Sequence, residues 1–141
     1  MNKIQYFFWL MLQTWSGMSY DWKISLTLLI IALLTLLLNN PFRHKSSTRQ
    51  NLLFLLMPFA VTFMIFLIGT IFAHNNSHSL PPKWPVYLLI GMASLHIPLG
   101  GFLVWKMKGF RWMTITLNIF QMQLSRWALF VAGMSVTGDW L

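Results

Sequence analysis

Two titratable side chains inside apolar stretches are the first candidates for chemistry: His96 and Arg126. An imidazole can ligate haem iron or bond to a quinone, and a guanidinium can neutralise an anionic group such as a haem propionate. Gly100, one turn beyond His96, leaves room for a ring edge. The two residues are therefore a candidate cofactor site for haem or quinone, with hydrogen-bonded packing as the alternative role of His96. A second axial histidine would have to come from another chain, because no other histidine lies in an apolar segment.

A polar stripe runs along the last apolar segment, about residues 112–134. At about 100° per residue, four of its polar side chains fall within about 60° of one another, and Arg126 lies on the shoulder of this stripe. The four are Thr114, Asn118, Gln121 and Ser125. We predict that the stripe and Arg126 contact a partner protein. The alternatives are hydrogen bonds between helices of the same chain, worth about 0.6 to 2 kcal/mol each, or a lined cavity.

The depth of Arg126 in a membrane depends on where its helix ends. If the helix ends near Trp127, Arg126 extends to the headgroups. If the helix continues to Met134, Arg126 lies near mid-membrane, where an unpaired arginine costs about 2.5 to 3.5 kcal/mol on insertion scales. The two carboxylates, Asp21 and Asp139, lie near the chain ends and are not expected to reach it. The sequence therefore predicts that the counter-charge comes from another polypeptide, a lipid or a cofactor.

His74 and His78 are weak candidates for a metal site. Their i, i+4 spacing suits copper or zinc ligation on a helix. The surrounding residues AHNNSHSLPPKW favour a loop, with no carboxylate or thiolate nearby. No metal site is predicted.

Composition identifies lipid as the solvent of the long segments. Of 141 residues, 57% are hydrophobic and 9% charged, whereas soluble domains contain about a quarter charged residues. A spanning helix needs about 20 apolar residues. We predict an all-α polytopic membrane protein, a single domain of four transmembrane helices. These helices cover about residues 22–40, 52–72, 86–105 and 112–134.

The N-terminal segment is predicted to be an amphipathic helix that lies in the membrane interface, over about residues 3–16. Its apolar run of about 12 residues is too short to span, and its polar residues gather on one narrow side. It begins like a signal peptide, but the run is crowded with aromatic residues and bulky Trp15 lies at the candidate cleavage region.

The distribution of cations predicts the topology. Residues 39–51 and 106–111 contain three Lys or Arg each, whereas residues 73–85 contain one. Because cytoplasmic loops are enriched in cations, we expect the first two loops in the cytoplasm. Both termini and residues 73–85 are then extracytoplasmic, in an inner or plasma membrane. This topology accounts for the net charge of +8, so no nucleic-acid partner is predicted.

The shortage of reactive groups bears on function. The chain has no cysteine and only two carboxylates, which excludes thiol oxidation and paired-carboxylate catalysis. We therefore predict a non-enzymatic accessory or assembly subunit of a larger membrane complex, with lipids and other integral membrane subunits as partners. One alternative is a haem- or quinone-contacting anchor subunit of an electron-transfer complex. Another is a stand-alone channel, transporter or immunity-type protein, with homo-oligomerisation left open.

Overall fold

The computed structural model describes residues 2–39, 54–73, 83–107 and 111–138, and within these ranges the chain is helical apart from short turns and contains no strand. This confirms the all-α prediction. The helices are α1 (Lys3–Tyr20), α2 (Trp22–Asn39), the 3₁₀ turn η2 (Phe54–Leu56), α4 (Met57–Ile71), α5 (Trp84–Ser94), α6 (His96–Lys106) and α7 (Arg111–Thr137).

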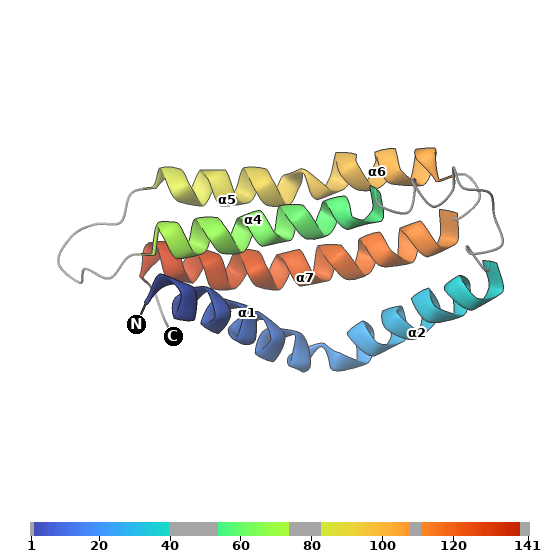
Figure 1. The fold of residues 1–141 in the computed structure, drawn as a ribbon, viewed down its shortest axis with the longest axis horizontal. Coiled ribbons are helices and arrows are strands. Elements are labelled where there is room, and N and C mark those ends of the chain that lie inside the picture. The colour runs from blue at the N-terminus through green and yellow to red at the C-terminus, as the bar shows by residue number, and fades with distance from the viewer. Residues whose placement is uncertain (1, 40–53, 74–82, 108–110, 139–141) are drawn as a thin grey trace.

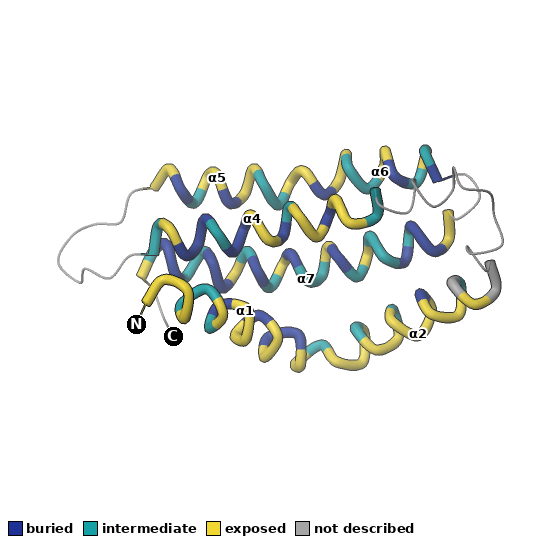
Figure 2. Tube along the Cα trace, in the orientation of Figure 1, coloured by how far each residue is buried: buried dark blue, intermediate teal, exposed yellow. Residues whose placement is uncertain are grey.

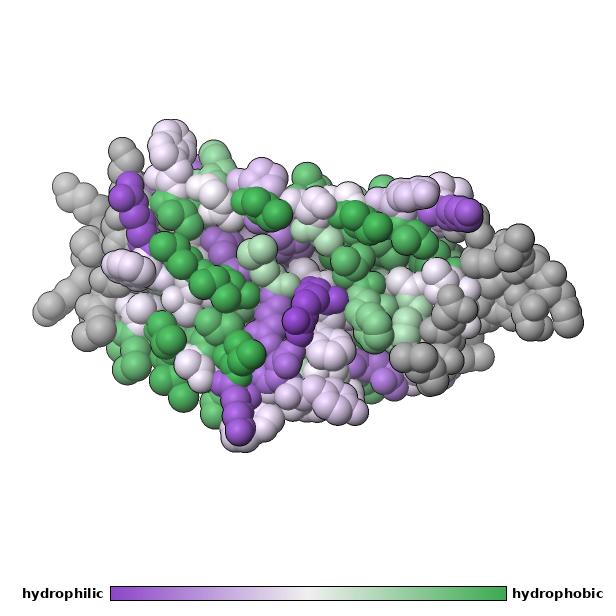
Figure 3. Space-filling view, turned by 180° about the vertical axis from the view of Figure 1, so that it is seen from behind, coloured by the Kyte–Doolittle hydropathy of each residue, from purple (hydrophilic) through white to green (hydrophobic). Residues whose placement is uncertain are grey.

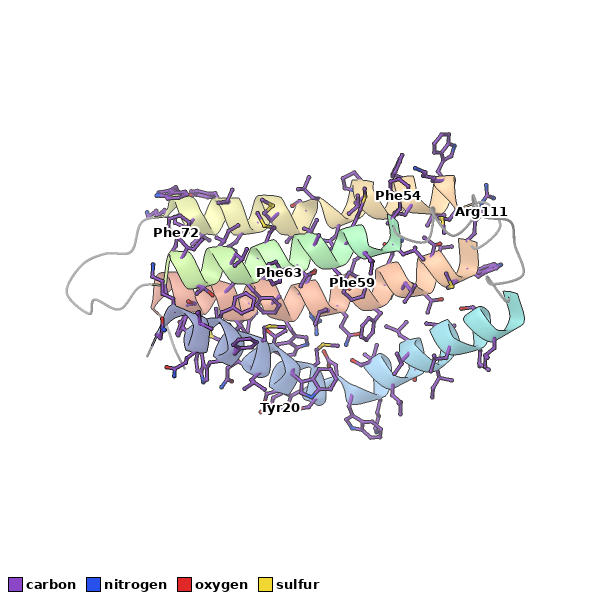
Figure 4. The ribbon with its side chains drawn as sticks, viewed as in Figure 1. Tyr20, Phe54, Phe59, Phe63, Phe72 and Arg111 are labelled. Atoms are coloured by element: carbon purple, nitrogen blue, oxygen red, sulfur yellow. The ribbon has the colours of Figure 1, made fainter. Side chains whose placement is uncertain are left out.

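The helices form an elongated bundle. In Figure 1, α4, α7 and the α5–α6 pair run along the long axis, and α1 and α2 together follow α7 on its other side. Both chain termini lie at the end of the bundle where α4 finishes. Figure 4 places Phe72 at this end and Phe54 and Arg111 at the opposite end. The termini therefore share one end of the bundle.

The central element is α7, which contacts α1, α2, α4, α5 and α6. Figure 2 shows buried residues along its whole length, whereas exposed residues predominate on α2. A helix with many polar residues thus occupies the position where neighbouring helices can supply hydrogen-bond partners. Central burial makes the polar content of α7 tolerable within an otherwise apolar bundle.

Two of the described helical segments are long and apolar enough to cross a membrane, Phe54–Ile71 and Trp84–Lys106. A third is added if α1 and α2, which are bent by 93° relative to each other, count as one broken span. These segments support a membrane location. They do not establish the predicted set of four spans, because α7 is not among them. Nor do they establish the interfacial helix over residues 3–16, since α1 continues to Tyr20 and packs against α4 and α7.

Prolines set two helix boundaries near the middle of the chain. Pro58 lies in the first turn of α4, where its missing N–H leaves no helical bond unmade. Pro98 cannot donate to the carbonyl of Ser94, and the helix breaks at Leu95 between α5 and α6. The break makes His96 the first residue of α6. Pro98 thus shapes the backbone around the histidine, and Pro58 lies at the start of a neighbouring helix.

Helices α4 and α7 pack closely near the end that holds the termini. A Cβ atom added at Gly69 of α4 would lie 2.8 Å from the Cβ and 3.0 Å from the Cα of Ala132 in α7. Close by, the Ser135 hydroxyl donates to the Gly69 carbonyl and is 2.8 Å from the Tyr6 hydroxyl of α1. A small residue in α4 therefore permits direct contact between helices, as is typical of membrane bundles.

Candidate functional site

His96 belongs to a buried hydrogen-bonded cluster at the junction of α4, α6 and α7. Its Nε2 atom lies 2.8 Å from the Ser125 hydroxyl, which lies 2.6 Å from the Thr62 hydroxyl. The Gln121 amide donates to Thr62 over 2.7 Å. We call Thr62, His96, Gln121 and Ser125 the His96 cluster; each side chain is at most 5% exposed.

The backbone carbonyl of Pro58 adds an acceptor to the cluster. It lies 3.2 Å from the Gln121 Nε2 atom, from the His96 Nε2 atom and from the Thr62 hydroxyl. Sequence reasoning did not assign a role to Thr62. The available signal was a hydroxyl in a strongly apolar helix, which must find a partner on a neighbouring helix or on its own backbone.

The hydrogen bonds fix the expected tautomer of His96. Its Nδ1 atom lies 3.2 Å from the Ala93 carbonyl, which can only accept. The Pro58 carbonyl, 3.2 Å from Nε2, is also an acceptor, so a neutral imidazole can donate to only one of the two carbonyls. We expect the proton on Nδ1, because Nε2 can then accept from the Ser125 hydroxyl at 2.8 Å, whereas the Ala93 carbonyl is the one hydrogen-bond partner of Nδ1 among the described residues. Ser125 then donates to His96 and Gln121 donates to Thr62, whose single proton can reach either the Pro58 carbonyl or Ser125.

We therefore expect nitrogen-15 NMR of histidine-labelled protein in lipid bilayers to show His96 as the Nδ1–H tautomer. Replacing Ser125 with alanine removes the donor to Nε2 and should shift the population toward the Nε2–H tautomer, which donates to the Pro58 carbonyl. The variant His96→Gln assigns the signal by deleting it. An Nε2–H tautomer in the unmodified protein would contradict this assignment.

The cofactor prediction meets two geometric constraints at His96. Both ring nitrogens are engaged in hydrogen bonds, so an axial bond to haem would require the loss of one of them. The space beside Gly100 faces the side chain of Asn118, whose Cγ would lie 3.4 Å from an added Cβ. His96 and Arg126 are also not brought together, because Ser125 faces His96 whereas Arg126 faces α1. The haem or quinone role stays a prediction.

The polar stripe of α7 faces the interior of the bundle. Thr114, Gln121 and Ser125 are at most 3% exposed, and Asn118 is half-buried against α6. Gln121 and Ser125 bond to other helices of the same chain, although the Gln121 Oε1 and Asn118 Nδ2 atoms have no hydrogen-bond partner among the described residues. A partner role for the stripe stays a prediction, and it would require the bundle to open.

Arg126 lies near the middle of α7, because the helix continues past Trp127 to Thr137. Its guanidinium forms an ion pair with Asp21, and the Trp127 indole donates to the same carboxylate oxygen over 3.3 Å. The expectation that neither carboxylate reaches Arg126 is therefore wrong. The physical reason is the bend at Asp21, between α1 and α2, which places that carboxylate against α7.

The ion pair lies at the surface of the bundle. The Arg126 side chain is 66% exposed and that of Asp21 28% exposed, and neighbouring Lys23 is also exposed. We call Asp21, Lys23 and Arg126 the charged elbow. Figure 3 shows hydrophilic side chains near the middle of one face of the molecule, with apolar areas on both sides.

The remaining predicted site residues, His74 and His78, lie outside the described residues, as do most of the predicted loops. Within the described ranges, no group of three or more His, Cys, Asp or Glu side chains is placed to hold a metal ion. No protein-family model, curated protein or solved structure matches this chain. The functional proposal therefore rests on the chain's own geometry.

Proposed function

We propose that the chain crosses the membrane four times and that α1 and α2 together form the first crossing. At about 1.5 Å per residue, α7 is about 40 Å long, and α1 and α2 are each about 27 Å long. Two such helices bent by 93° span about 37 Å from end to end, nearly the length of α7. The bundle end with Phe54 and Arg111 is then on the cytoplasmic side, because the cation-rich residues 39–51 and 106–111 adjoin it in the sequence.

Within this membrane, the chain acts as a non-catalytic accessory or assembly subunit of a larger complex. The observation that carries the proposal is the exposure of the charged elbow beside the middle of α7. Arg126 lies about 22 Å from the start of α7 and about 17 Å from its end. Charged side chains at mid-membrane are costly against lipid and normally face protein or a water-filled cavity. A partner subunit over the elbow would remove that cost.

The chemistry of the chain supports a structural role. Of its two carboxylates, Asp21 is already paired with Arg126, and the chain has no cysteine. The His96 cluster joins α4, α6 and α7 through bonds between their own side chains. These interactions hold the bundle together, and the charged elbow remains exposed.

Purification from native membranes in a mild detergent tests this function. We expect the chain to elute with at least one other integral membrane protein in fixed stoichiometry, measured by native mass spectrometry. The association should persist in Lys3→Gln, which alters an exposed cation at the start of α1. Recovery of the chain solely as a monomer or homo-oligomer would overturn the accessory role and favour a stand-alone channel or transporter.

A further inference from the structure

We infer that the charged elbow binds a transmembrane helix that has a carboxylate near its midpoint. This inference rests on the proposed function and specifies the chemistry of the partner. The elbow combines two cations, Lys23 and Arg126, with one anion, Asp21. Asp21 neutralises Arg126, and among the described residues no ion pair neutralises Lys23. One positive charge is therefore left beside the middle of the bundle.

The net charge favours a partner carboxylate over a second copy of the chain. Two copies packed elbow to elbow would bring two net positive charges together, and like charges at low dielectric repel strongly. A partner Asp or Glu would instead leave the interface neutral. Helix α7 of a second copy could not supply the missing negative charge, since none of its residues is acidic.

Depth favours a protein carboxylate over a lipid phosphate. The hydrocarbon core is about 30 Å thick, so phosphates lie about 15 Å from its centre. In the proposed four-crossing arrangement, the elbow lies near that centre. A helix can present a carboxylate at this depth, whereas a lipid headgroup remains at the surface. The carboxylate must therefore be part of a spanning segment.

An apolar groove across the bend provides a surface for the rest of such a helix. It has a volume of about 370 Å³, and its lining comes from both sides of Asp21 and from α7. Its larger lining residues are Trp15, Met18, Trp22, Leu26, Leu29 and Phe120. The Ser25 hydroxyl in this groove is buried and has no hydrogen-bond partner among the described residues. A partner helix would cover these apolar side chains while its carboxylate meets Lys23.

The test uses model transmembrane peptides of leucine and alanine that differ only at the central residue, which is Asp, Asn or Leu. The protein is reconstituted in phosphatidylcholine vesicles with a fluorophore on Leu33→Cys, an exposed site in a chain that otherwise lacks cysteine. Energy transfer to labelled peptide measures association. We expect the Asp peptide to bind at least about tenfold more tightly than the Leu peptide, a difference of about 1.4 kcal/mol.

Variants of the protein establish where the carboxylate binds. Lys23→Gln should reduce binding of the Asp peptide to the level of the Asn peptide, whereas Lys3→Gln should leave it unchanged. Equal binding of the Asp and Leu peptides, or an unchanged preference in Lys23→Gln, would overturn the inference. So would displacement of the Asp peptide by phosphatidylglycerol, which would identify a lipid phosphate, or displacement of the peptide by self-association, seen as energy transfer between two differently labelled copies of the protein, which would identify a second copy.

The peptide experiment and the purification experiment test the two proposals independently. A stoichiometric native partner without any preference for the Asp peptide would overturn the carboxylate inference and leave the accessory role standing. A clear preference for the Asp peptide in a chain that purifies without partners would overturn the accessory role alone.

Discussion

Replacing Gly69 with valine is expected to lower the stability of the bundle by about 1 to 3 kcal/mol, the usual cost of overpacking. The added Cβ would meet the Cβ and Cα of Ala132 at 2.8 and 3.0 Å. Neither atom belongs to a flexible side chain, so rotation cannot relieve the clash and α4 must move away from α7. That movement also stretches the bond from Ser135 to the Gly69 carbonyl.

The matched control is Gly91→Val in α5, where an added Cβ has no neighbour within 4 Å among the described residues. Both substitutions change the helical propensity of a glycine in the same way, but only the first changes the packing. Unfolding in mixed detergent and dodecyl sulfate micelles, followed by circular dichroism, measures the difference. Equal losses of stability in the two variants would show that α4 and α7 do not touch at Gly69.

Replacing Arg126 with leucine is expected to destabilise the protein in bilayers by about 2 kcal/mol or more, because Asp21 is left without its counter-charge. Removing both charges in Asp21→Leu/Arg126→Leu should recover most of this stability, since no unpaired carboxylate then remains. A double-mutant cycle, with unfolding measured in lipid bicelles that retain a bilayer, gives the coupling. Additive effects of the two single substitutions would contradict the ion pair.

The same variants separate folding from partner binding. The double leucine variant keeps Lys23 and therefore the net positive charge of the charged elbow, so it should fold, insert and retain the co-purifying partner. Lys23→Gln should also fold and insert, yet lose that partner. Arg126→Lys should preserve the ion pair with Asp21 only in part, since lysine lacks the planar fork of a guanidinium. Partner association that survives in Lys23→Gln would place the docking surface elsewhere on the bundle.

Much of the helical architecture follows from local sequence. The predicted segments 52–72, 86–105 and 112–134 correspond closely to η2–α4, α5–α6 and α7, and residues 22–40 correspond to α2. Apolar runs and prolines in the sequence predict the helix boundaries to within a few residues. The N-terminal helix predicted over residues 3–16 is shorter than α1, which continues to Tyr20 and packs against α7.

The sequence does not reveal which residues meet across the bundle. Asp21 and Arg126 are 105 positions apart, and their pairing depends on the bend between α1 and α2. Likewise, the polar stripe was visible in the sequence, but its partners were not. Thr62 and the Pro58 carbonyl lie on α4, and only the packing of α4 against α7 brings them to Gln121.

The long separation between Asp21 and Arg126 also affects the order of biosynthesis. In the proposed topology, the ribosome completes the bent first crossing long before it makes the arginine that neutralises its carboxylate. The newly made α1 and α2 must therefore wait at the translocon or the membrane surface until α7 emerges. The last helix then completes the membrane integration of the first, so a chain truncated before Arg126 would leave its N-terminal crossing unfinished.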